Sequence, residues 1–138
     1  MSETLHYGDV AVGAELPPLD VPITTAIVVG GALASRDFTP VHHDRGAAQA
    51  QGMSDIFMNI LTTNGYVGRF VTDWAGPDAL IKGVWIKLGG PNLPGDTMKM
   101  RGKVLSKEDG IAVVEVVGKN SWGNHVEGRV KVALPAGA

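Results

Sequence analysis

The chain contains no cysteine, so disulfide bonds, thiolate metal sites and cysteine nucleophiles are all excluded. Charged residues make up only 19% of the sequence, and the formal net charge of −2 argues against binding to nucleic acids or to an anionic membrane surface. No apolar run approaches the ~20 residues that a membrane span requires. The N-terminus also lacks the basic and apolar segments of a signal peptide. These absences predict a cytoplasmic protein.

Apolar residues make up 44% of the 138 residues, which is enough for one globular domain with a modest core. No internal repeat, low-complexity segment or block of like charge divides the sequence. We therefore expect residues 1–138 to form a single domain.

The most informative segment contains Asp37 and His42, with Pro40 between them. The proline prevents a continuous helix and biases Thr39 toward an extended conformation. An acid and an imidazole on a short, stiffened loop can face one cavity, and this pairing suits general acid–base chemistry near neutral pH. Asp44 is better explained as the cap of the short helical turn that follows it.

The segment before this loop gives weaker signals. Residues 8–22 contain three prolines, which predict extended or irregular structure. Thr24 or Thr25 can cap a short helix over residues 26–34. Two glycines weaken that helix, and a run of aliphatic residues would also suit a strand.

Apolar side chains recur at spacings of three and four residues from Met53 to about Asp73. This periodicity predicts a mostly buried helix of about five to six turns. Gly52 marks its start, and Gly76 followed by Pro77 stops it. The backbone N–H of Gly52 would then lie at the positive end of a helix, where it can stabilise developing negative charge.

The C-terminal part of the chain predicts strands separated by turn residues. Because the connections are short, these strands should form a meander of antiparallel hairpins. One long apolar helix followed by such strands indicates the α+β class, with the sheet curled around the helix. The predicted strands are Leu80–Gly89, Thr97–Lys107, Ile111–Asn120 and His125–Leu134.

The chain resembles the MaoC-like (R)-specific enoyl-CoA hydratases, whose motif runs Gly-Asp-x-Asn-Pro-[Ile/Leu/Val]-His. Here the motif reads Arg36-Asp37-Phe38-Thr39-Pro40-Val41-His42, so an arginine replaces the glycine and a threonine replaces the asparagine. The segment from Gly8 to Leu19 also resembles the start of that domain. The resemblance covers nearly the whole chain and implies a hot-dog fold, an antiparallel sheet wrapped around one long helix.

Longer segments, such as Val41–Arg45 and Val71–Pro77, resemble the small MaoC-like subunits of heteromeric hydratases that act on steroid side chains. The resemblance implies an acyl-CoA substrate, hydration of its 2-enoyl group, and no cofactor or metal beyond the substrate's own coenzyme A. It also implies a second hot-dog subunit, which lacks the acid–imidazole pair and completes a heterodimer or heterotetramer. Homodimeric hydratases usually have His-Gly-Met where this chain has Gln51-Gly52-Met53.

Hydration of a 2-enoyl thioester needs activated water, a proton for the α-carbon, and stabilisation of negative charge on the thioester oxygen. Asp37 and His42 can meet the first two needs by holding one water between them, and either residue could be the base. Gly52 is the expected donor to the thioester oxygen. Thr39 and Asn59 are further candidate substrate-binding residues, and Asn59 could approach the acyl chain.

Several alternatives stay open. The chain could be a homodimeric hydratase acting on other acyl-CoAs, or a hot-dog thioesterase in which an acid activates water against the thioester carbonyl. It could also be a non-catalytic subunit, which the intact acid–imidazole pair disfavours. Asp37, His42, His43 and Asp44 could together act as metal ligands.

Overall fold

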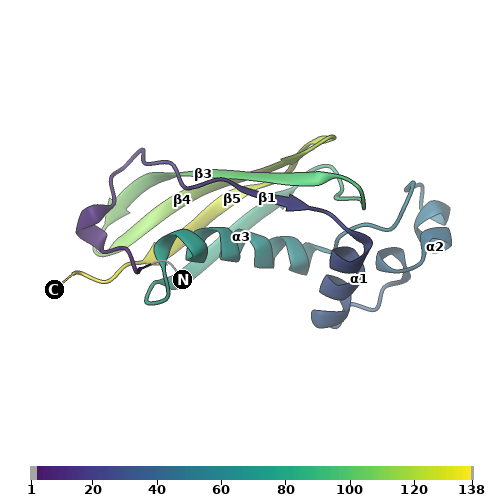
Figure 1. Ribbon diagram of the computed structural model, residues 1–138, viewed down its shortest axis with the longest axis horizontal. Helices are drawn as coiled ribbons and strands as arrows, with labels where there is room; N and C mark the ends of the chain where they lie inside the picture. Colours follow the sequence, from purple (N-terminus) through teal and green to yellow (C-terminus); the bar gives the residue numbers. More distant parts are fainter. Residues whose placement is uncertain (1–2, 138) are drawn as a thin grey trace.

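The computed structural model describes residues 3–137 of the chain. In chain order its elements are η1 (Tyr7–Asp9), β1 (Leu19–Pro22), α1 (Thr25–Ala34), η2 (Pro40–His42), α2 (Arg45–Ala50), α3 (Ile60–Ala75), β2 (Leu80–Leu88), β3 (Thr97–Glu108), β4 (Ile111–Asn120) and β5 (Gly123–Ala133). Figure 1 shows α3 lying along one face of an antiparallel sheet, with α1 and α2 near one end of it. The predicted α+β class is therefore confirmed. None of the helices within residues 3–137 has both the length and the apolar character needed to cross a membrane.

The predicted short helix is present as α1, although its aliphatic residues would also have suited a strand. The side chain of Thr24 accepts a hydrogen bond of 3.1 Å from the backbone N–H of Ile27, and this cap satisfies one of the free donors at the helix start. Gly31 lets α1 approach α3 closely, because a Cβ at this position would lie only 2.2 Å from Oγ1 of Thr62. Gly31 therefore lowers the intrinsic stability of the helix but allows it to pack closely against α3.

The helix α3 begins at Ile60, so the prediction that it starts near Met53 is wrong. The side chain of Asn59 caps it by accepting a hydrogen bond of 2.9 Å from the backbone N–H of Thr62. The residues before Asn59 do not make helical hydrogen bonds. The N–H of Phe57 donates to the carbonyl of Val41, and the N–H of Met58 donates to the carbonyl of Asn92. Their helical spacing arises because a non-helical segment also buries apolar side chains here.

The strands pair in the order β1-β3-β4-β5-β2, and the hairpins β3–β4 and β4–β5 are confirmed. The predicted meander is wrong for β2, which pairs with β5 rather than with β3. The connection over residues 89–96 contains two prolines and is too long for a tight hairpin turn. It carries the chain from one edge of the sheet across to the far side.

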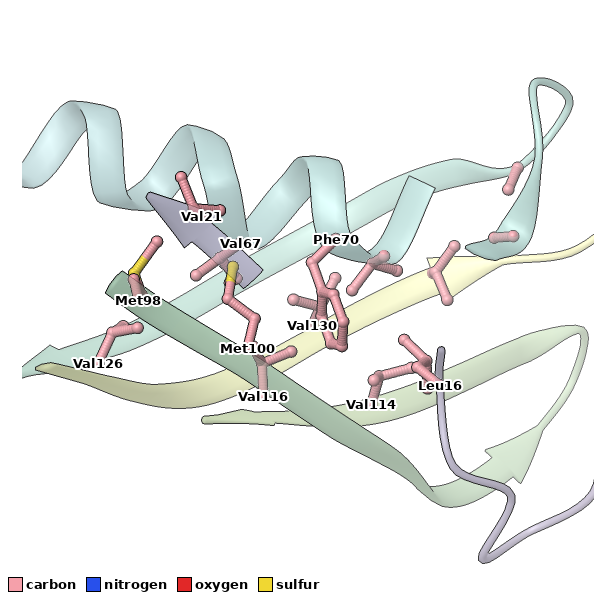
Figure 2. Packing of buried hydrophobic residues seen from close by; sticks show 14 of the residues in the cluster. Leu16, Val21, Val67, Phe70, Met98, Met100, Val114, Val116, Val126 and Val130 are labelled. Atoms are coloured by element: carbon pink, nitrogen blue, oxygen red, sulfur yellow. The ribbon is translucent and has the colours of Figure 1, made fainter. Parts of the chain in front are cut away.

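The core lies between α3 and the sheet. Figure 2 shows Val67 and Phe70 of α3 among Met98 and Met100 of β3 and Val130 of β5. Each of these side chains is at most 2% exposed. Burial of one such side chain is worth roughly 1.5–3 kcal/mol, so this layer fixes the helix against the sheet. The start of α3 is thereby fixed as well.

Replacing Gly31 by alanine should destabilise the fold by about 1–3 kcal/mol, because the new Cβ would overlap Thr62. The hydroxyl of Thr62 is held 2.5 Å from Oδ1 of Asn59 and cannot turn away freely. Gly30→Ala is the matched control. Nothing lies within 4 Å of a Cβ there, and the better helix propensity should add up to ~1 kcal/mol. Urea unfolding of both variants checks this, and equal effects would contradict it.

Candidate active site

Asp37 is positioned by the way in which α1 ends. Arg36 has a left-handed backbone with φ of 57°, and the N–H groups of Arg36 and Asp37 bond back to the carbonyls of Leu33 and Ala32. This is the Schellman arrangement, which usually places glycine at the left-handed position. A non-glycine residue there costs roughly 1–2 kcal/mol. The glycine of the resembled motif is therefore explained by conformation, and Arg36 adopts the same backbone.

His42 lies at the end of the short helical turn η2 and is 7% exposed. Its Nδ1 lies 2.7 Å from the carbonyl oxygen of Phe57. Because a carbonyl can only accept, Nδ1 carries a proton and donates it. The other nitrogen, Nε2, faces Oδ2 of Asp37 at 3.2 Å. The predicted pairing of acid and imidazole is thus present, and Nε2 is the nitrogen free to exchange a proton.

The carboxylate of Asp37 accepts hydrogen bonds at both oxygens. Oδ1 takes the hydroxyl of Thr39 at 2.6 Å and its backbone N–H at 3.2 Å, while Oδ2 takes the amide of Asn59 at 3.1 Å. The Thr39 hydroxyl, the Asn59 amide and the Thr39 backbone lower the pKa of Asp37 to about 2, with a smaller contribution from His42. Asp37 is therefore ionised at neutral pH. The threonine that replaces the motif's asparagine serves the carboxylate through its hydroxyl.

Asn59 uses both ends of its side chain and is 2% exposed. Its amide nitrogen donates to Oγ of Ser35 at 2.9 Å and to Asp37, while its oxygen caps α3. That Asn59 could approach the acyl chain stays a prediction, and the residue does line the cavity beside Asp37. Its side chain also links Asp37 to the start of the long helix. Ser35, which sequence reasoning missed, completes this link by donating to the carbonyl of Gly31 at 2.7 Å.

Gly52 does not lie at the start of the long helix, so the basis for choosing it as the thioester donor is wrong. It follows α2 with φ of 88°, and its N–H is bonded to the carbonyl of Gln49 at 3.0 Å. Met58 and Asn59 directly precede α3. The segment Gln51-Gly52-Met53, which was compared with His-Gly-Met, therefore does not lie at the start of the long helix. In the described part of the chain, the N–H groups of Asn59, Ile60 and Leu61 have no hydrogen-bond partner.

A cavity of about 470 Å³ adjoins these groups. Its walls are mostly apolar, and they include the acid–imidazole pair and the start of α3. The lining residues are Asp37, His42, Met53, Phe57, Met58, Asn59, Ile60, Leu88, Gly89, Gly90, Pro91 and His125. His125 is a second lining histidine that sequence reasoning missed, because it is the first residue of a predicted strand and belongs to no local motif.

The metal-site alternative finds no support. Within residues 3–137, no three histidine, cysteine or acidic side chains gather so that they could hold a metal ion. Asp44 instead caps α2, as predicted, by accepting a hydrogen bond of 3.0 Å from the N–H of Ala47. Its neighbour His43 is exposed.

Comparison with known proteins gives a family and a close relative. The family model described as MaoC like domain matches residues 10–131. A relative from Mycobacterium tuberculosis (strain ATCC 25618 / H37Rv) is named 3-oxo-4,17-pregnadiene-20-carboxyl-CoA hydratase beta subunit. It is 50% identical over 123 residues, which cover 89% of this chain and 95% of the relative.

Many solved structures are similar to this chain, and two of them illustrate the range of identity. A chain of the ChsH1-ChsH2 complex from Mycobacterium tuberculosis is 49% identical with a TM-score of 0.89, over 90% of this chain and 98% of that one. The R-hydratase PhaJ1 from Pseudomonas aeruginosa, in its unliganded form, is 20% identical with a TM-score of 0.89, over 97% and 88% of the two chains. At this low identity the second likeness concerns the fold, and it confirms the expected hot-dog architecture.

The free energy of unfolding should fall as the pH is lowered from about 4 to about 2. The pKa of Asp37 is about 2 in the folded protein, against an ordinary value of 3.8, so the unfolded chain binds more protons in this range. Asp37→Asn removes this titration and should flatten that part of the pH profile, measured by urea unfolding from pH 6 to pH 2. Thr39→Val should make this loss of stability smaller, because the pKa of Asp37 in the folded protein would rise toward its ordinary value, and Thr39→Ser, which keeps the hydroxyl, should not. Parallel profiles for the wild type and Asp37→Asn would contradict the assignment.

Proposed function

The chain belongs to the MaoC-like domain family, and from this premise we propose that it is a cytoplasmic enoyl-CoA hydratase and the catalytic subunit of a heteromeric enzyme. The observation that carries the proposal is the contact of 3.2 Å between Nε2 of His42 and Oδ2 of Asp37 beside the cavity. Its substrate is the 2-enoyl-CoA thioester of a steroid side chain, and its product is the 3-hydroxyacyl-CoA.

The substrate class and the partner follow from the half-identical relatives. The 50% identical relative is named as the beta subunit of a 3-oxo-4,17-pregnadiene-20-carboxyl-CoA hydratase. The 49% identical chain was solved as part of the ChsH1-ChsH2 complex. A partner also suits the surface of this chain. The edge strand β2 exposes apolar side chains, with Leu80 59% and Trp85 56% exposed. An apolar edge strand is a liability unless another chain covers it. The second subunit forms a heterodimer or heterotetramer with this chain.

The acid–imidazole pair supplies both proton transfers. The carboxylate of Asp37 accepts a proton from water while the water oxygen bonds to the β-carbon and the electron pair of the double bond moves toward the thioester. His42 starts this cycle with a proton on both ring nitrogens, and Nε2 gives its proton to the α-carbon. The proton on Asp37 then passes across the contact of 3.2 Å to His42, which restores the starting state.

This division of roles is supported by the hydrogen bonds of each residue. Asp37, with its pKa of about 2, begins each cycle ionised, so it acts as the base when water adds. The Nδ1 proton of His42 is committed to Phe57, so only Nε2 takes part. When His42 gives up its proton, the positive charge beside Asp37 is lost and the carboxylate becomes more basic.

The thioester oxygen binds at the start of α3 rather than at Gly52. The N–H groups of Asn59 and Ile60 are free of protein partners, and both residues line the cavity. They lie at the positive end of a helix of 16 residues, which favours negative charge. One such donor is worth about 3–4 kcal/mol of barrier in other enzymes.

Asp37→Asn and His42→Ala should each lower kcat/KM for hydration by roughly 10²–10⁴-fold while the protein stays folded. The measurement is the loss of enoyl-thioester absorbance, followed in parallel with a reagent for free thiols. Hydration consumes the enoyl group without releasing thiol, whereas a thioesterase would release it. His43→Ala, which changes an exposed histidine next to the site, should keep wild-type turnover. Near-normal turnover in either dyad variant would disprove the mechanism.

Co-expression of this chain with its neighbouring genes should yield a particle that contains a second hot-dog chain. Mass measurement of the purified particle gives its stoichiometry, and the steroid enoyl-CoA should be hydrated by the mixed particle far faster than by this chain alone. The physical reason is that the uncovered β2 edge and its apolar side chains favour association. A fully active, soluble particle made of this chain alone would remove the heteromeric part of the proposal.

A further inference from the structure

The second cavity histidine, His125, is held at both ring nitrogens. It projects from β5 and is 3% exposed. Its Nδ1 lies 2.7 Å from the carbonyl oxygen of Gly90, and its Nε2 lies 2.8 Å from Oγ1 of Thr63. A ring held on two sides in this way has one orientation and no freedom to turn.

The partners of His125 determine its protonation. The carbonyl of Gly90 can only accept, so Nδ1 donates, and Nε2 must then accept the hydroxyl proton of Thr63. Burial lowers the pKa of His125, which keeps the ring neutral at physiological pH. The hydroxyl of Thr63 has one proton and can donate to one acceptor at a time. Its contacts with the sulfur of Met58 and the carbonyl of Asn59 are longer, at 3.4 Å each, so His125 is the preferred acceptor.

These two hydrogen bonds join three elements around the cavity. Gly90 belongs to the connection that forms one wall, and that connection is also tied to β5 by the bond from the N–H of Gly89 to the carbonyl of His125 at 2.8 Å. Thr63 lies in the first turn of α3, two residues after Leu61, the last residue with a free N–H group. The imidazole therefore connects the helix start to the opposite wall.

We propose that His125 and Thr63 are a positioning pair for the hydration reaction, which hold the first turn of α3 so that its free N–H groups meet the thioester oxygen. This inference rests on the proposed function. Neither residue takes part in proton transfer, because Nδ1 of His125 is held by a carbonyl, and its Nε2 is bonded to the Thr63 hydroxyl rather than to the acid–imidazole pair. Their effect falls on charge stabilisation in the transition state, which depends on donor placement within a fraction of an ångström.

The test compares Thr63→Val with Thr63→Ser in the assembled enzyme. Valine has the shape of threonine without the hydroxyl, so it breaks the bond to His125 and leaves the packing nearly unchanged. We expect Thr63→Val to lower kcat tenfold or more with KM changed less than threefold, because charge on the oxygen develops mainly in the transition state. Thr63→Ser should keep at least half of the wild-type kcat.

Controls separate positioning from folding. The fraction of folded, assembled enzyme is measured by circular dichroism and by mass for each variant. If Thr63→Val does not fold, His125→Asn replaces it, since asparagine can keep the bond to Gly90 while losing the one to Thr63. Its kcat should fall as Thr63→Val is expected to. In the wild type, histidine ¹H–¹⁵N correlation spectra should show the neutral tautomer with the proton on Nδ1.

Each contrary result has its own meaning. A wild-type enzyme without hydratase activity would remove the proposed function and this inference together. An active wild type, with kcat of Thr63→Val or the fallback His125→Asn within twofold of it, would overturn the inference alone. An equal loss in Thr63→Ser, a loss confined to KM, or an Nε2-protonated tautomer would overturn it as well.

Discussion

The side chain of Asn59 holds together the two parts of the site. Its oxygen caps α3, and its amide nitrogen donates to Asp37 and to Ser35 at the end of α1. One buried amide thus fixes the helix start, where negative charge can be stabilised, relative to the carboxylate. Both polar atoms of this side-chain amide are hydrogen-bonded, which is the condition under which a buried polar group stabilises a single arrangement.

The close packing of α1 against α3 depends on the same contacts. Gly31 leaves no room for a Cβ beside Thr62, and Thr62 in turn bonds the oxygen of Asn59. At the end of α1, the left-handed Arg36 turns the chain so that Asp37 faces this junction. The acid is therefore oriented by backbone geometry on one side and by a helix cap on the other. His42 completes the site from a separate turn, anchored by the carbonyl of Phe57.

Much of the local structure could be predicted because its causes are local. The cap at Thr24, the cap at Asp44 and the three C-terminal strands follow from residues next to one another in the sequence. The start of α3 could not be predicted from apolar spacing, because residues 53–59 bury apolar side chains without forming a helix. The N–H groups of Phe57 and Met58 bond to the distant carbonyls of Val41 and Asn92 instead. Asn59 itself was the available signal, since asparagine is a common helix cap.

The sequence by itself determined the acid, the imidazole and their spacing around Pro40, and its resemblance to a known family indicated the reaction. Only the tertiary structure decided which groups surround the pair. Thr39 and Asn59 reach Asp37, while Gly52 lies elsewhere with its N–H already bonded. His125, far along the chain, meets Thr63 only because β5 packs beneath α3. Caps, turns and strands depend on neighbouring residues, so they can be predicted from the sequence. A hydrogen bond between distant residues depends on the packing of the whole core.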